Sequence, residues 1–304
     1  MSVAEKARAD TVMAGIGWMI LTTLCFVCVT GIVRFVGTDI PAAQAAFIRY
    51  AFGVLLFLPW MGPLLRNLPP ARVLRLYTAR GVTHGLAVIL WFYAMARIPI
   101  AEVTALGYTA PIFVTIGAAL FFGERLHIRR IAAVVVGFLG TLIILRPGFQ
   151  EIAWGQAAQL AAAPLFAASF LLAKRLTDDE DPVLIVIMLS IFCTLTLLPF
   201  ALLDWHTPRY ETVLWLALTA VFATLGHYTM TRAIGAAPLT VTQPVGFLQL
   251  VWAALLGIAV FGEPLDPFVL LGGGIVVAAI TFISHREAVA ARRQMTPPAP
   301  ATKD

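Results

Sequence analysis

Charged residues are scarce in this chain. They make up 12% of its 304 residues, whereas 60% of the residues are hydrophobic. A soluble domain has roughly a quarter of its residues charged and about half apolar. Because one globular core does not hide this much apolar surface, the composition excludes an ordinary soluble protein and predicts a protein embedded in lipid.

Cysteines and enzyme motifs are also few. Cys25 and Cys28 are spaced C-x-x-C, but both lie inside one apolar run, whereas a redox or metal site of that spacing needs a turn and polar surroundings. We interpret them as small buried side chains. No H-E-x-x-H, G-x-S-x-G or Walker A pattern occurs. The sequence therefore predicts neither an enzyme nor a metal or cofactor site, and it predicts no ATP-driven step within this chain.

Long apolar runs dominate the chain instead. A helix that crosses a membrane needs about 20 such residues, and helices are expected because lipid cannot satisfy an open backbone. The run that begins at Val12 exceeds a signal-peptide core, so it is predicted to be a retained first span. Ten segments qualify: 12–35, 42–62, 77–97, 101–122, 128–145, 155–175, 183–203, 211–234, 238–261 and 267–284.

Lys and Arg are distributed unevenly between the two sides of this predicted all-α bundle. With a cytoplasmic N-terminus, 16 of them fall in cytoplasmic stretches and 4 in external ones, and Arg49 stays inside a span. Cytoplasmic loops carry such an excess. We therefore predict a multi-pass protein of the cell inner (plasma) membrane with both termini cytoplasmic. The net charge of +5 is then a topology signal, and no nucleic-acid partner is expected.

The chain also repeats itself. "FFGERL" at 121–126 returns as "VFGEPL" at 260–265, 139 positions later. At this shift Pro99 falls on Pro238, Gly107 on Gly246 and Tyr108 on Phe247; near the N-terminus a shift of 140 sets Phe26 on Phe166 and Arg34 on Lys174. The predicted organisation is a cytoplasmic tail at 1–11, five-helix repeats at 12–148 and 149–288, and a disordered cytoplasmic tail at 289–304. Because five is odd, the second repeat is inverted, which is the architecture of many secondary transporters.

Each copy of the repeated phrase contains Gly followed by Glu. A glycine can end a helix with positive φ, and a glutamate can cap the first amides of the next helix. We therefore predict structural roles for Glu124 and Glu263.

The repeated segments resemble a known family. "TALGYTAPIFVTIGAALFFGERL" (104–126) and "PVGFLQLVWAALLGIAVFGEPL" (244–265) are similar to the drug/metabolite transporter (DMT) superfamily, in its EamA-type ten-helix branch. The resemblance covers nearly the whole chain apart from the tails. It implies a transporter that works by alternating access on a small organic metabolite. Members handle amino acids, nucleotide-like cofactors, vitamins and drugs, and one similar branch exports aromatic and other apolar amino acids.

Charges inside a span are costly, roughly 2.5–3.5 kcal/mol at the membrane centre, so each one needs a reason. Arg49 is the only basic residue well inside a span. It either snorkels or bonds a helix end, or it is a counter-charge for an anionic group such as a carboxylate. His84 and His227, in the corresponding third and eighth spans, are either neutral and bonded to a neighbouring helix or carriers of protons. Transport is accordingly predicted to be facilitative or weakly proton-coupled.

The fourth and ninth spans each carry a polar and aromatic stripe. Thr104 and Tyr108 share one helical face of the fourth span with Pro111 and Thr115. Such stripes either line a cavity or bond helices together. Trp91, on the face of His84, adds a candidate stacking wall. The candidate substrate-binding residues are Arg49, His84, Trp91, Thr104, Tyr108, His227, Gln243, Phe247, Gln249 and Trp252.

The expected partners are a small-molecule substrate and the lipid bilayer. One intramembrane cation with aromatic candidates favours export of amino acids or related metabolites. The alternative is an uptake carrier for a larger planar metabolite, such as a vitamin or nucleoside-like cofactor; a non-transporting membrane scaffold is a third hypothesis. "LLGGGIVV" (270–277) lets the last span pack closely on a neighbouring helix or on another subunit, so the chain is expected to be a monomer or a homodimer.

Overall fold

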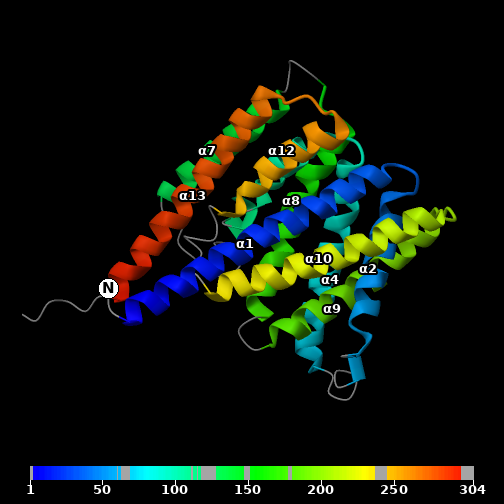
Figure 1. Cartoon of the computed structure of the whole chain (residues 1–304), viewed down its shortest axis with the longest axis horizontal. Coiled ribbons are helices and arrows are strands. Elements are labelled where there is room, and N and C mark those ends of the chain that lie inside the picture. Colours follow the sequence, from blue (N-terminus) through cyan, green and yellow to red (C-terminus); the bar gives the residue numbers. More distant parts are fainter. Residues whose placement is uncertain are drawn as a thin grey trace, which may run out of the picture.

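The protein is a bundle of long α-helices (Figure 1). The computed structural model describes residues 3–59, 61–62, 69–110, 112–114, 116–117, 128–146, 151–176, 180–236 and 245–295. No strand occurs within those ranges, so the predicted all-α class is confirmed. The helices are α1 (Val3–Val36), α2 (Ala42–Leu56), α4 (Ala71–Met95), α5 (Ile100–Gly107), α7 (Ile128–Leu145), α8 (Trp154–Leu176), α9 (Pro182–Leu203), α10 (Tyr210–Ala236), α12 (Leu248–Phe261) and α13 (Pro267–Met295).

Each predicted span overlaps one of these helices, but two spans are interrupted. α1 and α13 extend beyond their spans, and residues 289–295, predicted to be disordered, form the end of α13. α5 ends at Gly107, where a turn at Tyr108 follows, and α12 begins directly after a turn at Phe247. The helical spans predicted over 101–122 and 238–261 are thus each interrupted by a turn within their described residues. One cause is visible in the sequence: Pro111 lacks the N–H that would bond the Gly107 carbonyl.

Four helices are long and apolar enough to cross a membrane among the described residues. Their apolar parts are Val12–Val36, Trp154–Ala173, Val183–Leu203 and Tyr210–Met230, and α2, α7, α12, α13 and the region of α5 contribute shorter apolar segments. The outward face of α7 is apolar as well: Val135, Phe138 and Leu139 are 52%, 47% and 53% exposed. Such a surface is suited to contact with lipid.

Each helix of the first half has a counterpart in the second half: α1 and α8, α2 and α9, α4 and α10, α5 and α12, α7 and α13. When each helix is replaced by its counterpart, the main packing pairs recur. α1 packs on α10, and its counterpart α8 packs on α4; α4 also packs on α9, and α10 on α2. Three further contacts, α2 with α9, α5 with α12 and α7 with α13, join helices that are counterparts of each other. Figure 1 shows α7 beside α13 and α1 beside α10. The sequence repeat is thus accompanied by a repeated pattern of packing.

The ends of the described chain lie together. The start of α1 and the end of α13 are at the same end of the bundle, at the lower left of Figure 1. An even number of crossings brings both termini to one side of a membrane. That this side is the cytoplasm stays a prediction.

α7 and α13 approach each other closely at two glycines. A Cβ added to Gly272 would lie 2.4 Å from the Gly140 carbonyl oxygen, and one added to Gly140 would lie 2.7 Å from the Gly272 carbonyl oxygen. Both neighbours are backbone atoms, which cannot move aside as a side-chain end can. The small residues expected to let the last span pack closely therefore serve a contact within the chain.

Replacing Gly272 with Ala should lower the thermal stability of the purified protein in detergent. The added methyl group would push α7 and α13 apart, and overpacking of this kind costs roughly 1–3 kcal/mol. Gly274→Ala is the matched control, because a Cβ there has nothing within 4 Å. Equal melting temperatures for the two variants would contradict the close backbone contact.

The repeated Gly-Glu phrase is described in its second copy. Gly262 has φ +62°, and the N–H groups of Gly262 and Glu263 donate to the carbonyls of Ile258 and Gly257, which closes α12 with a left-handed turn. The carboxylate of Glu263 then accepts the Ile100 N–H at 2.9 Å and lies 3.0 Å from Arg34.

The helix that Glu263 caps differs from the prediction. Glu263 was expected to cap the helix that follows it, α13, but it caps α5 in the first half of the chain. Asp266 occupies the predicted position instead, since its carboxylate accepts the Phe268 N–H at 2.8 Å. The reason is that the αL turn at Gly262 aims Glu263 back across the bundle. Glu124, in the first copy, lies outside the described residues.

Candidate functional site

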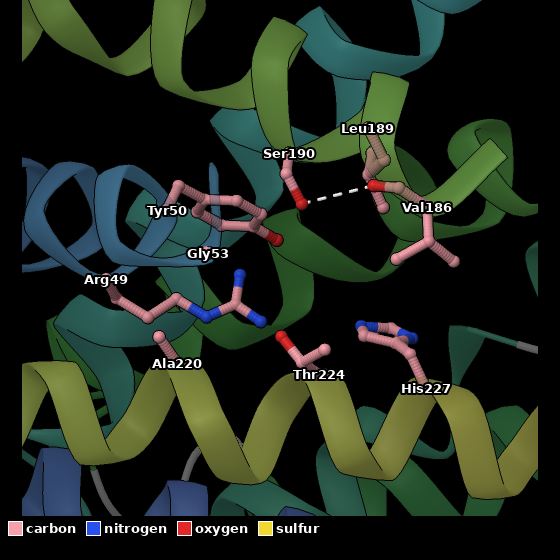
Figure 2. A pocket seen from close by; sticks show the side chains of 9 residues that line it. All are labelled: Arg49, Tyr50, Gly53, Val186, Leu189, Ser190, Ala220, Thr224 and His227. Carbon is pink, nitrogen blue, oxygen red and sulfur yellow. Dashed lines mark hydrogen bonds between the residues drawn. The ribbon is translucent and has the colours of Figure 1, made fainter. Parts of the chain in front are cut away.

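A small pocket lies between α2, α9 and α10 (Figure 2). α2 contributes Arg49, Tyr50 and Gly53; α9 contributes Val186, Leu189 and Ser190; α10 contributes Ala220, Thr224 and His227. The start of α2 is fixed in place by the fully buried Gln44, which donates to the His206 carbonyl at 2.6 Å and accepts the His206 N–H at 3.1 Å. Gln44 thereby ties α2 to the segment between α9 and α10.

Arg49 is the charged group of this pocket. It is 9% exposed, and its guanidinium carbon lies 3.8 Å from the centre of the Tyr50 ring. Figure 2 shows the guanidinium inside the pocket, with the hydroxyls of Tyr50 and Thr224 directed toward it. This arrangement leaves the planar cation facing the pocket among hydroxyl groups, where it can donate hydrogen bonds to a ligand.

The two predicted histidines make equivalent ring contacts. His84 of α4 meets Phe166 of α8 edge-on at 5.2 Å between ring centres, and His227 of α10 meets Phe26 of α1 at 5.3 Å. Phe26 and Phe166 are the pair that the sequence repeat matches. Each histidine therefore packs on the equivalent phenylalanine of the other half.

An aromatic wall extends from His84. Its ring contacts Tyr50 at 6.2 Å, so the wall is connected to the pocket, and its Nδ1 lies 3.0 Å from the Ser169 hydroxyl. Trp91 continues the wall, because its ring meets Phe166 at 6.0 Å. Stacked and edge-on rings of this kind suit the faces of planar ligands.

Tyr108 and Phe247 form a second aromatic contact, at the two helix breaks. Their rings are edge-on at 5.1 Å, and the Tyr108 hydroxyl is 3.5 Å from the Phe247 carbonyl oxygen. The repeat pairs these two residues. The interrupted helices of the two halves therefore meet at their breaks.

Other predicted residues serve the helix packing. Thr104 donates to the Ile100 carbonyl of its own helix at 2.9 Å, and Trp252 donates to the Thr23 hydroxyl at 3.2 Å. Gln249 is partly exposed on α12. Gln243 lies outside the described residues. Of the predicted set, the structure brings Arg49, His84, Trp91 and His227 into one connected region and joins Tyr108 to Phe247.

Residues of this region that were not predicted include Tyr50, Phe166, Ser190 and Thr224. Tyr50 follows Arg49 directly, so adjacency to an intramembrane charge was an available signal. The match of Phe166 with Phe26 was another. Ser190 and Thr224 carried no signal, because hydroxyl residues in apolar helices commonly bond their own backbone, as Ser190 does with Val186 at 3.1 Å.

The pocket is nearly closed in this conformation. Its free volume is about 10 Å³, which is room for about one water molecule. An organic metabolite needs some hundreds of Å³, roughly 300–1,000. The helices around the pocket must therefore separate before such a ligand can enter.

The chain was compared with known proteins. The EamA-like transporter family matches it twice, over residues 13–146 and 153–285. The chain belongs to the EamA-like transporter family. This EamA-like transporter is accordingly a multi-pass protein of the cell inner membrane, surrounded by lipid, with a small-molecule substrate.

Named relatives of this EamA-like transporter include vitamin and cofactor carriers. A "Riboflavin transporter" of Rhizobium johnstonii is 32% identical, covering 93% of this chain and 94% of its own length. A "Riboflavin transporter" of Vibrio cholerae serotype O1 is 28% identical, covering 93% and 96%. An "S-adenosylmethionine uptake transporter" of Rickettsia bellii is 25% identical, covering 91% and 95%. These are names of transporters and not of enzymes.

Proposed function

We propose that this protein is an uptake carrier for a planar vitamin- or cofactor-type metabolite of the flavin class. The observation that carries the proposal is the 32% identity with a riboflavin transporter over 290 residues, nearly the full length of both chains. The aromatic wall of His84, Trp91 and Phe166 supports it, because a flavin ring offers a large flat face. The carbonyl oxygens of such a ring can accept hydrogen bonds from Arg49.

The carrier works by alternating access between two five-helix halves of opposite orientation, with both termini cytoplasmic. Three observations support this part of the proposal: the exchange of helix pairings between the halves, the breaks at Tyr108 and Phe247, and the shared end of the two termini. Interrupted helices at a repeat interface are typical of such carriers.

Export of amino acids is the second candidate. Arg49 favours it, because a guanidinium binds a carboxylate with two parallel hydrogen bonds. Nothing in the relatives' names supports it.

Uptake by proteoliposomes tests the two candidates directly. Vesicles that contain the purified protein and unlabelled riboflavin should accumulate labelled riboflavin by exchange, whereas labelled phenylalanine and leucine should stay near the level of empty vesicles. Exchange of amino acids without exchange of riboflavin would reverse the proposal in favour of the exporter. The double-site variant His84→Ala/Trp91→Ala, which removes two rings of the wall, should lower riboflavin exchange.

A further inference from the structure

The charge of the pocket has one sign. Of the nine described residues that line it, Arg49 is a permanent cation, His227 is an imidazole, and none is Asp or Glu. Tyr50, Ser190 and Thr224 add hydroxyl groups. A ligand in this pocket therefore meets hydrogen-bond donors and positive charge, and no described lining residue supplies a carboxylate to balance a positive ligand.

The ion pairs of the described chain involve other residues. Arg34 pairs with Glu263, Arg146 with Asp266, Arg209 with Asp39, and His206 lies near Asp204. All of these acids lie at or between helix ends, outside the pocket lining. None of these pairs between described residues involves Arg49.

A second cation lies close to this region. Arg80 is one helical turn before His84 on α4, and its Nη1 donates at 3.2 Å to the carbonyl of Ile185, which precedes the lining residue Val186. The carboxylate of Glu180 approaches the same part of α4, but it accepts the Tyr77 hydroxyl at 3.2 Å and does not line the pocket. Arg80 therefore adds to the positive character around the pocket.

The effect on ligand choice is large. Two like charges about 6 Å apart at an effective dielectric constant of about 20 repel enough to weaken binding about a hundredfold. A neutral ring with carbonyl groups meets no such repulsion, and an anionic group gains attraction.

We propose that this pocket accepts planar solutes that are neutral or anionic and rejects cationic ones, with Arg49 as the residue that selects. The inference rests on the proposed function, because it assigns the charge class of the substrate within the vitamin and cofactor group. It separates the two substrate chemistries found in the relatives' names: riboflavin is neutral, whereas S-adenosylmethionine carries a sulfonium cation. On this proposal the chain accepts riboflavin-type solutes and rejects S-adenosylmethionine.

The test compares planar ligands that differ in charge. Binding to the purified protein in detergent is measured for riboflavin (neutral), flavin mononucleotide (anionic), acriflavine (cationic) and S-adenosylmethionine (cationic). Riboflavin and flavin mononucleotide should bind, and the two cations should bind at least about a hundredfold more weakly. Arg49→Gln should weaken flavin binding about tenfold and strengthen acriflavine binding, whereas Arg49→Lys should keep the rejection of cations.

Arg97→Gln is the control variant. Its guanidinium also stacks on a tyrosine, at 3.6 Å from the Tyr93 ring centre, but it is exposed and does not line the pocket. It should leave every affinity unchanged. Melting temperatures of all variants check that each one folds.

The outcomes separate the two proposals. Equal binding of cationic and neutral ligands, or an unchanged preference in Arg49→Gln, would overturn the charge selection while leaving flavin transport intact. Binding of flavin mononucleotide without riboflavin exchange in vesicles would support the charge selection and overturn the proposed substrate. If no ligand of the panel binds, both are wrong.

Discussion

Glu263→Gln should destabilise the folded protein more than the loss of any other described acidic side chain. Glu263 is 9% exposed and pairs with Arg34, which keeps 23% of its side chain exposed. Removing one partner of a buried ion pair leaves the other charge poorly solvated, at a cost of roughly 3–5 kcal/mol. We expect about 3 kcal/mol, the low end of that range, because water still reaches Arg34.

The isosteric change isolates the charge. A glutamine at 263 can still accept the Ile100 N–H, so the cap of α5 is kept and only the ion pair is lost. Glu263→Ala removes both and should destabilise the protein by about 1 kcal/mol more, the usual contribution of an N-cap. Unfolding of the purified protein by heat in detergent measures both differences.

Asp39→Asn is the matched control. Asp39 pairs with Arg209, but the two side chains are 49% and 74% exposed. An exposed pair contributes about 0–1 kcal/mol, so the melting temperature should barely change. If Glu263→Gln and Asp39→Asn unfold at the same temperature, the ion pair between Glu263 and Arg34 does not stabilise the protein more than an exposed pair does.

The helices were predictable because apolar runs long enough to cross a bilayer leave few alternatives. The breaks at Tyr108 and Phe247 were not, because hydropathy is insensitive to a single missing backbone hydrogen bond. The information was present in part, since Pro111 removes a donor four residues after Gly107.

The candidate site was predicted in part for a similar reason. Arg49 and His227 were found because polar groups inside a span are costly and therefore conspicuous. The partner of the Trp252 N–H is Thr23 on α1, a contact across 229 positions that no local pattern reveals. The helix that Glu263 caps was missed because it depends on how α5 and α12 meet in space.

Phe247→Ala should lower the rate of riboflavin exchange by up to about tenfold. The Phe247 and Tyr108 rings join the broken helices of the two halves at 5.1 Å. Such a pair is worth roughly 0.5–1.5 kcal/mol beyond its buried area, and about 1.4 kcal/mol corresponds to a factor of ten in an equilibrium. If the breaks are where the halves move against each other, that energy sets the balance between the two orientations of the carrier. Exchange in proteoliposomes measures the effect.

Two further variants distinguish motion from general damage. Tyr108→Phe keeps the ring pair and removes only a hydroxyl at 3.5 Å from its acceptor, so it should transport at nearly the normal rate. Phe138→Ala breaks another edge-on pair, with Phe113 at 6.4 Å, but Phe138 itself is 47% exposed on α7, which is neither of the two interrupted spans. It should lower exchange little. Equal losses of transport in Phe138→Ala and Phe247→Ala would mean that the ring at the break contributes stability alone, and the place where the halves move would then have to be sought elsewhere in the bundle.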